Sequence, residues 1–278
     1  MKEKKAVGIV LYNPDVDRFQ KCLKAVEKQC DKIYLVDNAS DNIPEILKIV
    51  EAHHLCQLIR NKKNMGIAAA LNQIMLVAES DGFEWVLTLD DDSVCDKDLL
   101  QKLWMKTKYA NTGIICPIAV DDRISSFKSE NNKGEWQEVK KCITAGALTN
   151  VYAWRKCGGF DEKMFIDFVD IEYCARLQEY GYRIVQVLDT CVHQQYGNVT
   201  RTISIFGKHF SIYNYSTLRI YYSVRNQIYY MRKHKESIDE LSQLFFLIGY
   251  IGKRIVFEKN RLKSIEAVFK GIRDGKNM

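Results

Sequence analysis

Three consecutive carboxylates, Asp90, Asp91 and Asp92, are the residues of this chain whose types and spacing first suggest chemistry. They follow the apolar run WVLTL, which is typical of a buried strand. Adjacent carboxylates repel one another, and this destabilises a fold unless a cation or hydrogen-bond donors compensate. Carboxylate oxygens suit Mg²⁺ or Mn²⁺, which commonly bind one or two carboxylates together with substrate phosphates. The run therefore predicts a divalent-metal site, and the alternative is a solvated turn that leads into the next helix.

The hydrophobic pattern predicts the elements that hold these carboxylates. Apolar runs rich in valine, isoleucine and leucine alternate with segments of helical periodicity, as in a parallel sheet covered by helices. We therefore predict an α/β fold in which ligands bind beyond the carboxyl ends of the strands. Asp37 and the aspartate triplet both end such runs, and Asp96 is a plausible cap of a following helix. The expected strands are residues 6–12, 32–37, 56–60, 85–90 and 113–118, and the expected helices are residues 15–29, 43–53, 66–80 and 96–110.

The second half of the chain departs from this rhythm. A polar excursion follows residue 120, and then come a helix near residues 170–180, a strand at 183–189 and a turn that holds His193. Beyond residue 205 the chain is aromatic, basic and helical, so we predict a catalytic domain at 1–205 and an extension at 206–278. Residues 201–278 contain 15 Lys and Arg against 6 Asp and Glu, whereas residues 1–200 contain 26 against 29. This asymmetry suggests that the extension meets phosphates, as nucleic acid, lipid headgroups or a diphosphate substrate.

Composition excludes several classes of protein. With 278 residues, 47% apolar and 27% charged, the chain is typical of one globular domain with an appendage. Its nine cysteines include no CxxC pair, so we interpret them as reduced thiols in the cytosol. No GxGxxG follows the first strand and neither GxxxxGKS nor GxxxxGKT occurs, so a dinucleotide fold and a P-loop are not indicated. The longest apolar stretch, residues 245–252, is shorter than the roughly 20 residues that span a bilayer.

Five motifs in register resemble the family 2 glycosyltransferases of GT-A fold. They are YN after the first strand, VDNAS, NKKNMGIAAALN, LTLDDDS and GGFDEKMFIDFVDIEYCARL. The resemblance covers nearly the whole chain and extends to bacterial rhamnosyltransferases, which use dTDP-L-rhamnose to build O-antigens, capsules and cell-wall polysaccharides. It implies a mostly parallel central sheet flanked by helices, with a C-terminal helical extension.

The resemblance also implies roles for individual residues. Asp37 would read the pyrimidine base, and Asp92 would bind the metal of the diphosphate together with Asp90. His193 would complete that metal shell, although a lone histidine is more often a packed residue. The middle acid of the triplet is usually glutamine in the rhamnosyl branch, whereas here it is Asp91. The residues implied on the nucleotide-sugar side are Tyr12, Asn13, Asp37, Asn38, Asn64, Gly66, Asp90, Asp91 and Arg225.

The transfer reaction needs a further acid on the opposite face of the sugar. Negative charge builds on the leaving nucleoside diphosphate, while the acceptor hydroxyl must lose a proton to a general base. In a single in-line displacement this inverts the anomeric carbon. By similarity with the family the base is Asp170, with Asp167 just upstream and Glu172 as the next acid. The competing interpretation is that Asp170 caps a helix whose first turn contains Glu172.

The extension leaves two interpretations open. Six tyrosines lie between residues 213 and 230, together with Arg219 and Arg225, and such a segment suits a membrane interface, a diphosphate lipid or a packed helical face. Residues 241–257 are strongly apolar and then basic. They could form a helix that lies on anionic lipid, or the same face could be buried in a homo-oligomer.

The leading hypothesis is an inverting, metal-dependent transfer of L-rhamnose from dTDP-L-rhamnose to a saccharide or lipid-linked saccharide acceptor at the cytoplasmic face of the membrane. A UDP-hexose or UDP-galactofuranose donor is the nearest alternative, because thymine and uracil differ by one methyl worth about 0.8 kcal/mol when buried. A sugar-phosphate nucleotidyltransferase would need a glycine-rich basic loop after the first strand, where YNPDVDRF stands instead. A non-catalytic saccharide- or nucleic-acid-binding module would need no divalent metal, and the order of the carboxylates argues against it.

Overall fold

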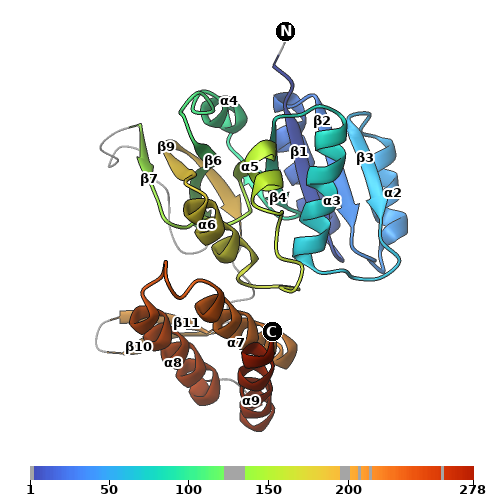
Figure 1. Cartoon of the computed structure of the whole chain (residues 1–278). Coiled ribbons are helices and arrows are strands. Elements are labelled where there is room, and N and C mark those ends of the chain that lie inside the picture. Colours follow the sequence, from blue (N-terminus) through green and yellow to red (C-terminus); the bar gives the residue numbers. More distant parts are fainter. Residues whose placement is uncertain (1–2, 122–134, 195–200, 206–207, 213–214, 258–259) are drawn as a thin grey trace.

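The computed structural model describes residues 3–121, 135–194, 201–205, 208–212, 215–257 and 260–278. Within these residues the core is a nine-stranded sheet of order β3-β2-β1-β4-β8-β6-β9-β5, with β7 paired to β9 (Figure 1). The strands are β1 (Ala6–Leu11), β2 (Lys32–Asp37), β3 (Cys56–Arg60), β4 (Trp85–Asp90), β5 (Val94–Cys95), β6 (Thr112–Asp121), β7 (Trp136–Glu138), β8 (Ala147–Asn150) and β9 (Arg183–Gln194).

The first four strands of the order are parallel, so their carboxyl ends share one edge of the sheet. In the register, Leu11 at the end of β1 pairs with Asp37 at the end of β2, and Val10 pairs with Asp90 at the end of β4. β8 runs antiparallel to β4 and β6, whereas β6 and β9 are parallel. Asp37 and Asp90 therefore lie at the same edge of the sheet, as the sequence predicted.

Helices cover both faces of the sheet. They are α1 (Val16–Val26), α2 (Ile43–Glu51), α3 (Ile67–Ser80), α4 (Leu99–Trp104), α5 (Val151–Lys156) and α6 (Val169–Glu179), with a short 3₁₀ turn at Glu27–Gln29. On one face Phe19, Ile46 and Leu99 bring α1, α2 and α4 into a single apolar cluster. On the other face Met75 of α3 and Trp154 of α5 belong to a second cluster, which also contains Tyr173 of α6. The sheet is thus buried on both sides, as continuous apolar strands require.

The sequence predicted most of this half correctly. The five expected strands correspond to β1, β2, β3, β4 and β6, and the four expected helices to α1, α2, α3 and α4. α4 is shorter than expected. Asp98, and not Asp96, is the residue at its N-cap position, so the predicted cap is wrong. Asp96 instead accepts a hydrogen bond from the backbone N–H of Cys191 at 2.8 Å. β9 runs to residue 194, so His193 lies in a strand and not in the expected turn. Most of the expected excursion, residues 122–134, lies outside the described part.

The C-terminal part forms a separate layer at one end of the sheet (Figure 1). It begins with the hairpin β10 (Arg201–Ile205) and β11 (Lys208–Ile212), so the chain beyond 205 is not entirely helical as predicted. The predicted boundary at residue 206 adjoins residues 206–207, which lie outside the described part. Three helices follow, α7 (Thr217–Lys233), α8 (Glu240–Phe257) and α9 (Arg261–Asn277), and share a small core that includes Val224, Leu247 and Val268. Across the residues that the structure describes, no helix combines the length and apolarity needed to cross a membrane.

Candidate active site

Asn38 organises the loop that joins β3 to α3. Its side chain is buried, and its amide donates to Asn64 Oδ1 at 2.9 Å and to the carbonyl of Gly66 at 3.2 Å. Its Oδ1 accepts from the backbone N–H of Met65 at 2.9 Å and from Asn61 Nδ2 at 3.2 Å. The side chain is thus committed to positioning this loop beside the end of β2.

Gly66 is fixed by geometry at the start of α3. Its φ is +86°, a conformation that L side chains rarely adopt, and a Cβ here would lie 2.7 Å from the carbonyl oxygen of Phe165. The next residue, Ile67, donates its N–H to that same carbonyl at 2.8 Å. The loop around Gly66 therefore packs directly on the segment that leads to Asp170.

Three more residues predicted on the nucleotide-sugar side, Tyr12, Asn13 and Asp37, lie at the same edge of the sheet. Asp37 is 1% exposed, and its carboxylate accepts the backbone N–H of Ser40 at 3.1 Å. Asn13 has a φ of +51° and accepts the backbone N–H of Asp41 at 2.6 Å. Tyr12, which precedes it, is 52% exposed. β1 and β2 thus end in interlocked loops that leave the Tyr12 ring open to solvent.

The three carboxylates of the aspartate triplet repel one another. Burial, followed by repulsion from Asp92, Asp91 and Asp170, raises the pKa of Asp90 to about 7. Burial and the charge of Asp92 raise the pKa of Asp91 to about 6, although a hydrogen bond from the Tyr12 backbone opposes this. Negative charge at the end of β4 thus exceeds what the neighbouring donors compensate.

A divalent cation fits this donor set. Arg18 Nη1 lies 3.5 Å from Asp92 Oδ2, but the pKa values of Asp90 and Asp91 remain raised in its presence. Partly buried carboxylate oxygens that repel one another are the ligands that Mg²⁺ and Mn²⁺ prefer. Asp90 and Asp92 therefore stay the predicted ligands of such an ion.

A cavity of about 480 Å³ brings Asp90 and Asp170 together. Its walls come from the end of β4, the segment at 166–171, and the helices α7 and α8. Asp170 lies in the first turn of α6 and accepts the backbone N–H of Ile171 at 2.9 Å. Burial raises its pKa to about 6 despite backbone hydrogen bonds that lower it. The residue at the N-cap position of α6 is Phe168, so the cap interpretation of Asp170 is wrong.

Two arginines that sequence reasoning did not select line this cavity. Arg219 donates to Asp167 Oδ1 at 3.0 Å, and Ser223 also donates to the Asp167 carboxylate. Arg254 is 4% exposed and packs over the ring of Tyr215, with 4.0 Å between the guanidinium carbon and the ring centroid. Both lie in the basic aromatic extension that the sequence pointed to, but nothing in the periodicity distinguished them from their neighbours.

Arg225, the basic residue that the resemblance selected, is not among the residues that line the cavity. Its guanidinium donates to the carbonyl of Lys163 at 2.6 Å and to Asn226 Oδ1 at 2.7 Å, and stacks on Tyr222. Asn226 in turn donates to the carbonyls of Ile166 and Asp167 at 2.8 and 2.9 Å. This arginine and asparagine therefore hold the segment before Asp170 against α7.

His193 is brought together with Asp96 and Cys191. Its Nε2 lies 3.1 Å from Cys191 Sγ and 3.6 Å from Asp96 Oδ1. Among the described residues, these three form the one group of His, Cys, Asp or Glu side chains that bring three metal-ligand atoms within 4.8 Å of one another. Asp90, Asp92 and His193 form no such group, so the predicted three-residue metal set is not assembled in this structure.

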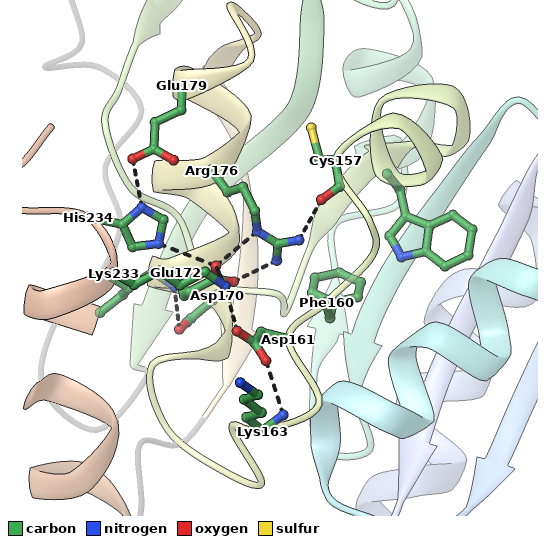
Figure 2. Close-up of polar contacts among 12 residues, drawn as sticks. Cys157, Phe160, Asp161, Lys163, Asp170, Glu172, Arg176, Glu179, Lys233 and His234 are labelled. Atoms are coloured by element: carbon green, nitrogen blue, oxygen red, sulfur yellow. Dashed lines mark hydrogen bonds and ion pairs between the residues drawn. The ribbon is translucent and has the colours of Figure 1, made fainter. Parts of the chain in front are cut away.

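A buried charge network joins α6 to α7 (Figure 2). Glu172 is fully buried, and its carboxylate lies 2.6 Å from Arg176 Nη2, 2.8 Å from Lys233 Nζ and 3.3 Å from His234 Nε2. Burial alone would raise the pKa of Glu172, but hydrogen bonds from His234, Arg176 and Lys233 lower it to about 2. The network therefore fixes the helix that carries Asp170 against the extension.

Comparison with known proteins identifies the chain. Residues 6–167 match the family described as "Glycosyl transferase family 2". The chain belongs to glycosyltransferase family 2. This glycosyltransferase is also 27% identical to the Shigella flexneri protein named "dTDP-rhamnosyl transferase RfbF", over 95% of this chain and 94% of that protein. The predicted family and the predicted enzyme class are confirmed.

Solved structures confirm the GT-A-like fold of this glycosyltransferase. The crystal structure of S. aureus TarS has a TM-score of 0.62 at 14% identity, covering 98% of this chain and 49% of TarS. The structure of GalNAc-T7 with UDP, GalNAc and Mn²⁺ has a TM-score of 0.59 at 13% identity, covering 89% and 54%. The structure of TarS 1-349 in complex with UDP-GlcNAc has a TM-score of 0.60 at 15% identity, covering 98% and 81%. The chain spans about half the length of the first two.

Proposed function

We propose that this glycosyltransferase transfers L-rhamnose from dTDP-β-L-rhamnose to a saccharide acceptor, with inversion at the anomeric carbon. The acceptor is a growing, lipid-linked saccharide of a bacterial surface polysaccharide, met at the cytoplasmic face of the membrane. The observation that carries the proposal is the cavity that contains both Asp90 and Asp170. The likeness to a protein named as a dTDP-rhamnosyl transferase, which runs over 95% of the chain, supports the choice of donor.

Asp170 acts as the general base in this proposal. It lies at the start of α6 and lines the cavity, where an acceptor hydroxyl can approach it. With a pKa of about 6, the carboxylate is ionised at neutral pH. This pKa is closer to neutral pH than that of an exposed aspartate, which makes Asp170 a stronger base. Asp170 therefore holds the proton that the hydroxyl loses when it attacks the sugar.

Asp90 and Asp92 would hold Mg²⁺ or Mn²⁺ at the end of β4. Such an ion stabilises the negative charge of a leaving nucleoside diphosphate. Asp37 and the loop around Asn64 bind the nucleoside at the neighbouring strand end, where Asn38 fixes that loop. On the other wall, the positive charge of Arg219 partly offsets the burial and the neighbouring carboxylates that raise the pKa of Asp90.

A donor panel tests this proposal. The purified protein is incubated with dTDP-β-L-rhamnose, UDP-glucose or UDP-galactofuranose, each with Mn²⁺ or with EDTA, and release of the nucleoside diphosphate is measured. We expect metal-dependent release from dTDP-β-L-rhamnose that the Asp170→Asn variant loses. Faster release from a UDP-sugar would show that the donor is that UDP-sugar, while the reaction would still be a sugar transfer. Because the panel contains no acceptor, water takes the sugar in this assay. The result that would contradict the proposed reaction is therefore no release from any donor together with no binding of dTDP by the wild type.

A further inference from the structure

Helix α8 exposes an apolar stripe on its outer side. Of its eighteen residues only Leu247 and Arg254 are buried. Leu241, Phe245 and Ile248 are 68%, 71% and 56% exposed, and their spacing of four and three residues places them on one face of the helix. Contiguous exposed side chains of this size mark surfaces that bind a membrane or another protein.

The inner side of the same helix belongs to the active site. Phe246, Tyr250 and Arg254 line the cavity that contains Asp170. One side of α8 thus faces the reacting groups while the stripe faces outward, in the separate helical layer seen in Figure 1. A membrane or protein bound to the stripe would therefore be separated from the cavity only by helix α8.

Basic side chains surround a groove next to the stripe. The groove lies between α7, α8 and α9, has a volume of about 630 Å³, and has an apolar floor that includes Leu244 and Ile272. Arg232, Lys235 and Lys276 also line it, against the single acid Glu240. An apolar surface beside cationic side chains complements the acyl chains and headgroups of an anionic bilayer.

Charge favours a bilayer over a second copy of the chain. Arg232, Lys235 and Lys276 outnumber Glu240 at the groove, so two copies joined through this surface would bring like charges together. An anionic membrane attracts the same surface. We propose that the outer face of α8, with the adjacent basic groove, docks on the surface of an anionic lipid bilayer and thereby presents the active-site cavity to an acceptor carried in that bilayer.

Vesicle binding tests this docking surface directly. Sedimentation with vesicles of phosphatidylcholine alone, or of phosphatidylcholine with phosphatidylglycerol, is measured without donor or acceptor. We expect binding to the anionic vesicles that weakens at high salt. The triple variant Leu241→Ser, Phe245→Ser and Ile248→Ser should bind roughly tenfold more weakly or worse, because it removes the apolar contact.

A matched variant controls for general loss of surface apolarity. Leu76→Ser, Met105→Ser and Tyr152→Ser change three exposed side chains of the catalytic part, which are 45%, 57% and 69% exposed, and should bind vesicles like the wild type. Thermal melting checks that both triple variants fold. The double variant Lys235→Glu and Lys276→Glu gives an independent arm and should weaken binding to anionic vesicles only.

Three outcomes would overturn the docking surface. They are no vesicle binding by the wild type, unchanged binding by the α8 variant, or a wild-type dimer in light scattering that the α8 variant converts to monomer. The last outcome would assign the stripe to a second copy of the chain. Because the assay contains no nucleotide, its failure leaves the proposed sugar transfer to be judged by the donor panel.

Discussion

Replacing Glu172 by glutamine should destabilise the fold strongly at neutral pH. The change keeps the shape of the side chain but leaves Arg176, Lys233 and His234 without the carboxylate that they surround. The pKa of Glu172 falls from 4.5 to about 2 in the folded protein, and at 1.36 kcal/mol per pKa unit this corresponds to about 3 kcal/mol. Removing one partner of a buried ion pair commonly costs a similar amount.

The pH dependence of this effect follows from the sign of the shift. Because the folded-state pKa is depressed, the contribution of Glu172 to the free energy of unfolding is present above pH 4.5. It is lost as the pH falls through the folded-state value of about 2. Denaturant unfolding of the wild type and of Glu172→Gln, followed by circular dichroism between pH 7 and pH 3, measures the difference. We expect a gap of about 3 kcal/mol at pH 7 that narrows toward pH 3.

Glu138→Gln is a suitable control for this measurement. Glu138 pairs with Arg183 at 2.9 Å, but its side chain is 52% exposed, and exposed ion pairs contribute between 0 and about 1 kcal/mol. The reasoning would be refuted if Glu172→Gln unfolded like Glu138→Gln, or if its deficit were the same at every pH. Either result would mean that the network in Figure 2 does not stabilise the contact between α6 and α7.

Three further predictions concern the active site. Asp170→Asn should slow sugar transfer roughly a hundredfold or more while the Kd for dTDP stays unchanged; similar losses of rate and of dTDP affinity would contradict its assignment as the base. The wild-type rate should rise with pH through about 6, because the ionised carboxylate of Asp170 is the active form, and a flat profile from pH 5 to 8 would exclude this. Gly66→Ala should cost about 2 kcal/mol or more in unfolding free energy because its Cβ would meet the Phe165 carbonyl. Gly82→Ala, with a φ of +79° and nothing within 4 Å, should cost only about 1 kcal/mol, and equal losses would show that the contact is unimportant.

The sheet could be predicted from sequence because its strands are continuous apolar runs. β2, β3 and β4 begin and end where those runs do, so the carboxylates that follow them reached the correct edge of the sheet. The hairpin β10–β11 does carry a strand pattern, because Ile203 and Ile205, and then Phe210 and Ile212, alternate with polar residues. It was missed because the whole segment beyond residue 205 was assigned to helices from its aromatic and basic composition. Each alternating run is only five residues long, so the pattern is weaker than the continuous apolar runs of the central strands.

Side-chain partners were harder to predict than positions. Asp96 was assigned to a helix cap by its place in the sequence, but pairing of β5 with β9 brings it to Cys191 and His193. Arg219 was noted only as part of a basic segment, and its role in the cavity wall depends on how α7 packs against the segment around Asp167. Contacts of this kind join residues far apart in the chain, so no local pattern reveals them.

The most direct test of the account is calorimetric titration of dTDP into the wild type, Asp92→Asn and Asp170→Asn, with Mn²⁺ and then with EDTA. It requires no acceptor. We expect dTDP to bind the wild type and Asp170→Asn equally well with Mn²⁺. EDTA should abolish binding, and Asp92→Asn should bind dTDP weakly even with the metal. A nucleotide-sugar site at the end of β4 would be contradicted if dTDP bound equally well with and without the metal and with and without Asp92, or if the wild type did not bind dTDP.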